Sequence, residues 1–225
     1  MGDVLGREGE LADCWLEPIG TGQVGANYRV HLNWNEGGGP STVVIKFAAL
    51  DPQSRATGIQ VGTYQREAGF YRHVAPTIEV AVPHLYYIDF VEGTADIAIV
   101  MEDLDPRVQG DQLRGCSPNE AALALSEAAK LHRAFWGDET LFDLAWVSRR
   151  NPEQTAQTIT LLEGLQPAFL ERYRDDLSRE AIEISEHFVR NATNWFAEIP
   201  EPSTLVHGDF RLDNLMFAPA DTDAT

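Results

Sequence analysis

An eight-residue stretch near the end of the chain has the residue types and spacing of a phosphoryl-transfer loop. It is His207-Gly208-Asp209-Phe210-Arg211-Leu212-Asp213-Asn214, which follows the pattern H-x-D-x-x-x-x-N. In such loops the aspartate accepts the proton of a substrate hydroxyl, and the asparagine five residues later ligates magnesium. We therefore expect Asp209 to be the catalytic base and Asn214 a metal ligand, with His207 as a packed, hydrogen-bonded structural residue. The alternative is a plain polar loop.

A glycine-rich turn near the start of the chain suits phosphate binding. Gly20, Gly22 and Gly25 follow the pattern G-x-G-x-x-G. In a dinucleotide-binding fold the third glycine opens a helix, whereas here residues 26–32 have the pattern of a strand. A glycine turn between two strands covers nucleotide phosphates in kinases, because glycine lets the backbone approach them closely. An NAD-binding oxidoreductase is therefore the weaker hypothesis, and a plain hairpin turn is the other alternative.

Two charged residues occupy positions where burial is expected. Lys46 lies in the β-branched run 42–47, and Glu67 lies inside the apolar stripe of a helix expected over 63–74. Either charge alone would be costly to bury, and pairing them removes both costs. A Lys–Glu pair between a strand and the next helix positions the α- and β-phosphates of ATP in kinases. The alternative is that both are edge residues that face water.

The elements that must position these residues fall into two groups along the chain. Strands are expected over 28–34 and 42–47, and as a hairpin of 85–90 and 97–101. Beyond Leu104 the pattern is helical. Helices are expected from the capping box at 117–120 to Gly137, over 153–163 and 167–175 with Gly164 and Pro167 between them, and over 178–196. Strands followed by helices predict an α+β fold. Residues 1–103 would form an N-terminal lobe, and 104–225 a helical lobe that carries the catalytic loop.

With these motifs in this order, the chain resembles the aminoglycoside phosphotransferase and choline-kinase-like family, which has the protein-kinase-like bilobal fold. The resemblance spans about residues 15–217, and the stretches 43–46, 66–71, 99–104, 130–136 and 206–209 carry it. It implies that ATP and Mg²⁺ are used, and that the backbone of Glu102 to Leu104 bonds the adenine. Gly208 stands where protein kinases have an arginine that gathers a phosphorylated activation loop, so control of that kind is not expected.

The chain departs from this family after the catalytic loop. The family has a second aspartate on the next hairpin, which is the main magnesium ligand, and further C-terminal helices. Asp221 and Asp223 lie in a polar, turn-like stretch and do not fit that aspartate. We therefore expect a C-terminally truncated chain with an incomplete helical lobe. Such a chain would be inactive and would self-associate or be unstable. The alternative function is a pseudokinase-like module that binds nucleotide without catalysis.

Composition limits the partners and the compartment. The 225 residues include 35 acidic and 17 basic side chains, a net charge of −18, which argues against nucleic-acid binding. The same charge favours, mildly, a cationic form of the small hydroxylated acceptor that the resemblance implies. No apolar run is long enough for a membrane helix, and the N-terminus does not look like a secretory signal. Cys14 and Cys116 are expected to be free thiols in the cytoplasm. The sequence does not set the oligomeric state.

Overall fold

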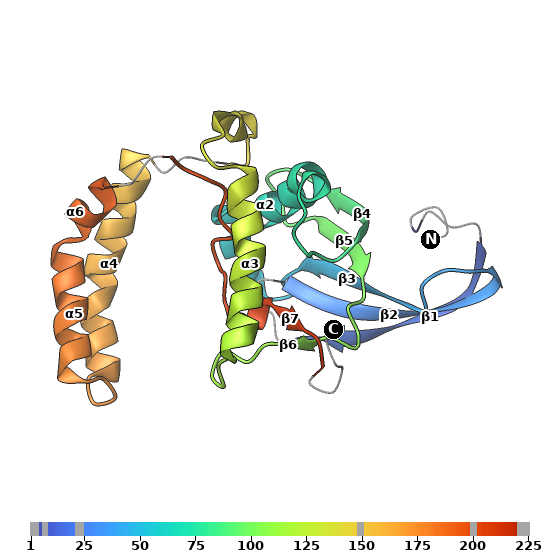
Figure 1. The fold of residues 1–225 in the computed structure, drawn as a ribbon, viewed down its shortest axis with the longest axis horizontal. Helices are drawn as coiled ribbons and strands as arrows, with labels where there is room; N and C mark the ends of the chain where they lie inside the picture. The colour runs from blue at the N-terminus through green and yellow to red at the C-terminus, as the bar shows by residue number, and fades with distance from the viewer. Residues whose placement is uncertain (1–4, 6–8, 21–24, 148–150, 199–201, 220–225) are drawn as a thin grey trace. The chain divides into compact units, whose positions relative to one another are not determined.

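The computed structural model describes residues 5, 9–20, 25–147, 151–198 and 202–219 (Figure 1). The chain divides into two compact units. The first is made of Met1–Trp136 and Thr204–Thr225, and the second of Gly137–Ser203. The segregated strands and helices confirm the predicted α+β class. The catalytic loop and the sheet therefore belong to one unit, and the idea that residues 1–103 form a lobe of their own stays a prediction.

The first unit is built on a five-stranded antiparallel sheet with the strand order β1-β2-β3-β5-β4 (Figure 1). The strands are β1 Gly9–Ile19, β2 Gly25–Gly37, β3 Thr42–Ala48, β4 Leu85–Phe90 and β5 Ile97–Glu102. Three predicted features, the strands near 28–34 and 42–47 and the 85–101 hairpin, are all present. In the register, Lys46 of β3 pairs with Asn27 of β2 on one side and with Ile99 of β5 on the other.

Each face of this sheet has its own apolar core, because side chains alternate along a strand. Val30, Val43 and Val100 are buried on one face. On the other face, β5 packs against the helix α2 Thr63–Gly69, which continues as a π-helical turn over Phe70–Val74. The sequence suggested one helix over 63–74, and it did not suggest the preceding helix α1 Pro52–Gln60. The helix that carries Glu67 thus covers the face of the sheet from which Lys46 points.

The remainder of the first unit holds the catalytic loop. A short strand β6 Val108–Gln109 pairs with β7 Met216–Phe217, and a 3₁₀ turn spans Leu212–Asn214. Helix α3 Pro118–Ala134 begins at the predicted capping box. The Thr204 hydroxyl donates to the carbonyl of His132 at 2.8 Å, so the end of α3 anchors the segment that leads into the loop.

The second unit is helical and corrects two predictions. It contains a 3₁₀ turn over Glu139–Asp143, α4 Pro152–Tyr173, α5 Arg179–Arg190 and α6 Ala192–Ala197. The helices expected over 153–163 and 167–175 are one helix, α4, with Gly164 and Pro167 inside it. A proline costs a helix about 3 kcal/mol. Here a capping box at Asn151 and packing against α5 outweigh that cost.

The single helix expected over 178–196 is instead two helices that meet at Asn191. The Asn191 side chain donates to the His187 carbonyl at 2.8 Å, and its backbone leaves the helical region at φ −109° and ψ 10°. An asparagine side chain that bonds nearby backbone competes with the helix in this way. Ile184, Phe188 and Trp195 are 61%, 38% and 67% exposed, so this unit presents an apolar surface.

Two sequence expectations about the whole chain can be compared with the described residues. Cys14 and Cys116 are both free and exposed. Among the residues that the structure describes, no helix has the length and apolar character needed to cross a membrane.

Candidate active site

The predicted ion pair between β3 and α2 is present. Lys46 Nζ lies 2.6 Å from Glu67 Oε1, and the two side chains are 32% and 21% exposed. The partial burial reduces screening of the pair by water, so Glu67 can hold the lysine side chain in one direction. The structure therefore supplies an oriented cation on the sheet face that α2 covers.

Gly25 makes room for that cation. A Cβ atom at position 25 would lie 2.9 Å from Cε of Lys46 and 3.2 Å from the carbonyl oxygen of Phe47. A larger residue would therefore push the lysine side chain out of its place. Gly20 has a φ of +73°, which glycine adopts without strain. Gly22 falls within 21–24, outside the described residues, and the approach of this turn to phosphates stays a prediction.

The segment after β5 offers a free backbone donor. The Glu102 N–H donates to the carbonyl of His84 at 2.8 Å, and the Glu102 carboxylate accepts from the His84 N–H at 3.1 Å. The Leu104 carbonyl accepts from the Arg107 N–H at 2.7 Å. Within the described part of the chain, the Leu104 N–H has no hydrogen-bond partner. It is therefore available to the edge of a planar heterocycle.

The catalytic loop holds its aspartate by both carboxylate oxygens. Asn214 Nδ2 donates to Asp209 Oδ2 at 2.9 Å and to the Asp209 carbonyl at 2.8 Å. Arg211 Nε lies 3.0 Å from Asp209 Oδ1. Gly208 has a φ of +82°, which turns the backbone sharply just before the aspartate. The Asp209 side chain is 63% exposed, so it is oriented and still open to a reactant.

His207 differs in part from its predicted role. Its Nδ1 accepts from the Asp209 N–H at 3.2 Å, so it is hydrogen-bonded as expected. It is exposed, however, and its ring contact is with Phe210, at 5.7 Å between centroids, in an edge-to-face arrangement. His207 therefore shapes the loop locally and is not packed in a core.

A second segment supports the catalytic loop, and no sequence pattern predicted it. Gln109 Nε2 donates to the Asp213 carbonyl at 2.5 Å, and the Leu212 N–H donates to Gln112 Oε1 at 3.0 Å. A Cβ atom on Gly110 would lie 2.4 Å from the Leu212 carbonyl oxygen. The stretch 109–112 thus lies in direct contact with the loop. Two-residue strands and isolated glutamines have no periodic pattern that could have revealed it.

Oxygen donors suited to magnesium gather in the catalytic loop. Asn214 places its amide nitrogen on Asp209, and its amide oxygen has no hydrogen-bond partner among the described residues, so that oxygen can face a cation. Asp213 Oδ1 is buried and has no hydrogen-bond partner in the described residues, so this carboxylate has an acceptor to spare. Across 5, 9–20, 25–147, 151–198 and 202–219, no three His, Cys, Asp or Glu side chains cluster to hold a metal by themselves. Magnesium usually completes its shell with water and substrate phosphates, so this donor set fits a phosphate-bound ion.

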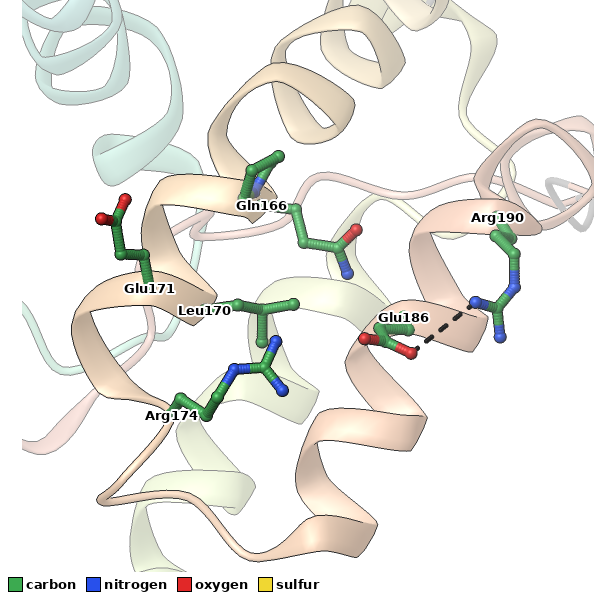
Figure 2. A pocket seen from close by; sticks show the side chains of 7 residues that line it. Gln166, Leu170, Glu171, Arg174, Glu186 and Arg190 are labelled. Atoms are coloured by element: carbon green, nitrogen blue, oxygen red, sulfur yellow. Dashed lines mark ion pairs between the residues drawn. The ribbon is translucent and has the colours of Figure 1, made fainter.

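A cavity of about 650 Å³ lies in the helical unit, between α4 and α5 (Figure 2). Gln166 and Leu170 of α4 line it, as does Arg174, which caps the end of that helix. Glu186 and Arg190 line it from α5, and Glu186 Oε2 lies 3.8 Å from Arg190 Nη1. None of the residues assigned chemistry above lines this cavity. Its lining has two acidic residues, Glu171 and Glu186, and two basic ones, Arg174 and Arg190, so it carries no net charge, and we assign the chemistry to the first unit instead.

Comparisons with known proteins show the family and the fold. A model of the phosphotransferase enzyme family matches residues 15–224. No curated protein matches the chain. The solved structures of similar fold include a candidate aminoglycoside phosphotransferase from Ralstonia eutropha JMP134, which is 22% identical and has a TM-score of 0.53. The match covers 96% of this chain and 58% of that protein. They also include the gentamicin complex of APH(2″)-IIa, which is 19% identical and has a TM-score of 0.53. This match covers 96% of this chain and 63% of that protein. The chain thus spans less than two thirds of either protein.

Proposed function

Because the chain belongs to the phosphotransferase enzyme family, we propose that it transfers the γ-phosphoryl group of ATP to a hydroxyl of a small molecule, with magnesium as cofactor. The Lys46–Glu67 ion pair carries this proposal, because it supplies an oriented cation for phosphates in the unit that also contains the Asp209 loop. Phosphoryl transfer needs positioning and charge neutralisation more than covalent catalysis by the protein.

In the proposed reaction each of these residues has one task. Lys46, directed by Glu67, holds the α- and β-phosphates, and the Leu104 N–H bonds the adenine. The Asp209 carboxylate orients the acceptor hydroxyl and takes its proton, while the hydroxyl oxygen forms a bond to the γ-phosphorus. The bond between that phosphorus and the oxygen of the departing ADP breaks. The Asn214 oxygen would help to hold magnesium, which supplies charge neutralisation on the phosphates when bound.

The acceptor that we propose is a hydroxylated small molecule, with a mild preference for a cation. The net charge of −18 supports this preference, because it attracts cationic solutes. The APH(2″)-IIa structure, which holds gentamicin, is a similar fold with a ligand of that general kind. We place the reaction in the cytoplasm, because the two cysteines are free.

The decisive experiment measures ATP turnover with a panel of alcohols, on the 225-residue chain and on a form extended to the length of the matched structures. We expect turnover from the extended form only, because Asn214 is neutral and Asp213 Oδ1 is buried, so a phosphate-bound ion needs a further, accessible charged ligand. ATP binding without turnover in both forms would instead favour a nucleotide-binding module. Robust turnover by the 225-residue chain would show that an acid within it serves the metal.

The 225-residue chain should also self-associate through the apolar surface of the helical unit. Ile184 and Trp195 are more than half exposed, and exposed apolar patches favour association. Light scattering should show a mass above 25.0 kDa that falls when both residues are changed to serine. As a matched control, Leu113→Ser changes a 99% exposed side chain in the first unit and should leave the mass unchanged. A monodisperse monomer of the unmodified chain would contradict this expectation.

Gly110→Ala should lower turnover in the extended form by about tenfold to 10²-fold, the range for a displacement of about 1 Å in a catalytic group. The added methyl group meets a backbone oxygen at 2.4 Å, so the loop that carries Asp209 must move. The matched control is Gly38→Ala, where the added Cβ meets no atom within 4 Å. Equal turnover of the two variants would exclude Gly110 as a support of the loop.

A further inference from the structure

A carboxylate whose side chain has little exposure anchors the segment that follows β5. The Asp103 side chain is 5% exposed and accepts two hydrogen bonds from Arg29 of β2. Arg29 Nε donates to Oδ2 at 2.6 Å, and Nη2 donates to Oδ1 at 3.1 Å. Bidentate pairs of this kind fix direction as well as distance. Arg29 and Asp103 are 74 residues apart in the sequence, so the pair ties this segment to a distant strand.

Further contacts make Asp103 a junction between β2 and the segment that follows β5. The Asp105 N–H donates to Asp103 Oδ1 at 3.2 Å, and Asp105 Oδ1 lies 3.7 Å from Arg29 Nη2. Burial would raise the pKa of Asp103, but hydrogen bonds from Arg29, the Asp105 N–H and the Thr42 side chain outweigh burial and lower it. The carboxylate is thus held in its ionised form, with hydrogen bonds from β2 and from its own segment.

This junction lies directly beside the free donor of the segment. Asp103 stands between Glu102, whose N–H is bonded to His84, and Leu104, whose N–H has no partner in the described residues. With the Asp103 side chain fixed on Arg29, the peptide groups on either side of it have fixed directions. We propose that Arg29 and Asp103 are a positioning pair that presents the Leu104 N–H to the adenine ring. This inference rests on the proposed use of ATP.

The test separates the adenine from the phosphates by using three ligands of the 225-residue chain. ATP binding is measured by calorimetry, and adenosine and tripolyphosphate binding by ligand-detected NMR. Asp103→Asn and Arg29→Lys should each weaken ATP and adenosine about tenfold, the effect of one hydrogen bond, and leave tripolyphosphate within twofold. Arg29→Lys is the milder variant, because lysine keeps the charge that a buried Asp103 needs and loses only the bidentate geometry. Lys46→Ala should give the reverse pattern, with tripolyphosphate lost and adenosine retained.

Asp96→Asn is the matched control, since Asp96 is an exposed aspartate in the β4–β5 turn, and it should alter none of the three affinities. Equal weakening of all three ligands, together with a lower Tm without ligand, would mean that the pair only stabilises the fold. Unchanged adenosine binding in both variants would overturn the positioning role and leave the proposed function standing. An unmodified chain that binds neither ATP nor adenosine would overturn both.

Discussion

Replacing Asp209 by asparagine in the extended form is expected to lower kcat by about 10² to 10⁴, the usual range for a positioned acid–base group, while KM for ATP changes little. Asparagine has nearly the same shape and can keep a contact with Asn214, but it cannot take the proton of the acceptor. It also leaves Arg211 without the anion that lies 3.0 Å from its Nε. The loss should therefore fall on the chemical step.

Steady-state kinetics with both substrates varied would measure this effect. Asp96→Asn is a suitable control, because Asp96 is an exposed aspartate in the β4–β5 turn and faces no reactant in the proposed mechanism. Near-normal turnover of Asp209→Asn would remove Asp209 as the base and would point to another carboxylate.

The sequence predicted those parts of the site that obey a local rule. Lys46 and Glu67 could be paired because each was a charge in an apolar pattern, and such charges need partners. Asp209 and Asn214 could be found because their spacing lies within one loop. The Arg29–Asp103 pair could not be found, because it depends on the register of β2 beside β3 and β5, which no local pattern encodes.

In the helical unit, two residues have effects that their local sequence pattern does not predict. Pro167 predicted a break that α4 does not have, because helix ends and packing contribute more than one lost hydrogen bond. Asn191 divides a helix that the apolar periodicity predicted as continuous, because its side chain bonds the His187 carbonyl. Sequence periodicity therefore located the helical unit and misplaced its interruptions.

ATP with magnesium should raise the Tm of the 225-residue chain, and Lys46→Ala should remove most of that rise. At a ligand concentration of about 100 times Kd, binding stabilises the folded state by about 2.7 kcal/mol, and a protein of this size gains about 2–4 °C per kcal/mol, so a shift of about 5–11 °C is expected. Among the described residues, the only ion pair of Glu67 is the one with Lys46, at 2.6 Å. Lys46→Ala removes the charge that would face the phosphates. If Kd rises about 100-fold, the remaining stabilisation is about 0.4 kcal/mol, or about 1 °C.

Glu67→Gln and Lys130→Ala separate the charge of Lys46 from its orientation. Glu67→Gln keeps the lysine but leaves it undirected, so we expect a shift between those of the unmodified chain and Lys46→Ala. Lys130 is the other lysine of the chain and pairs with Glu127 on α3, so Lys130→Ala should change the Tm equally with and without ATP. Differential scanning fluorimetry with ATP and NAD in parallel would measure all four proteins. An equal shift with NAD, or an undiminished ATP shift in Lys46→Ala, would show that the Lys46–Glu67 pair does not bind the phosphates of ATP.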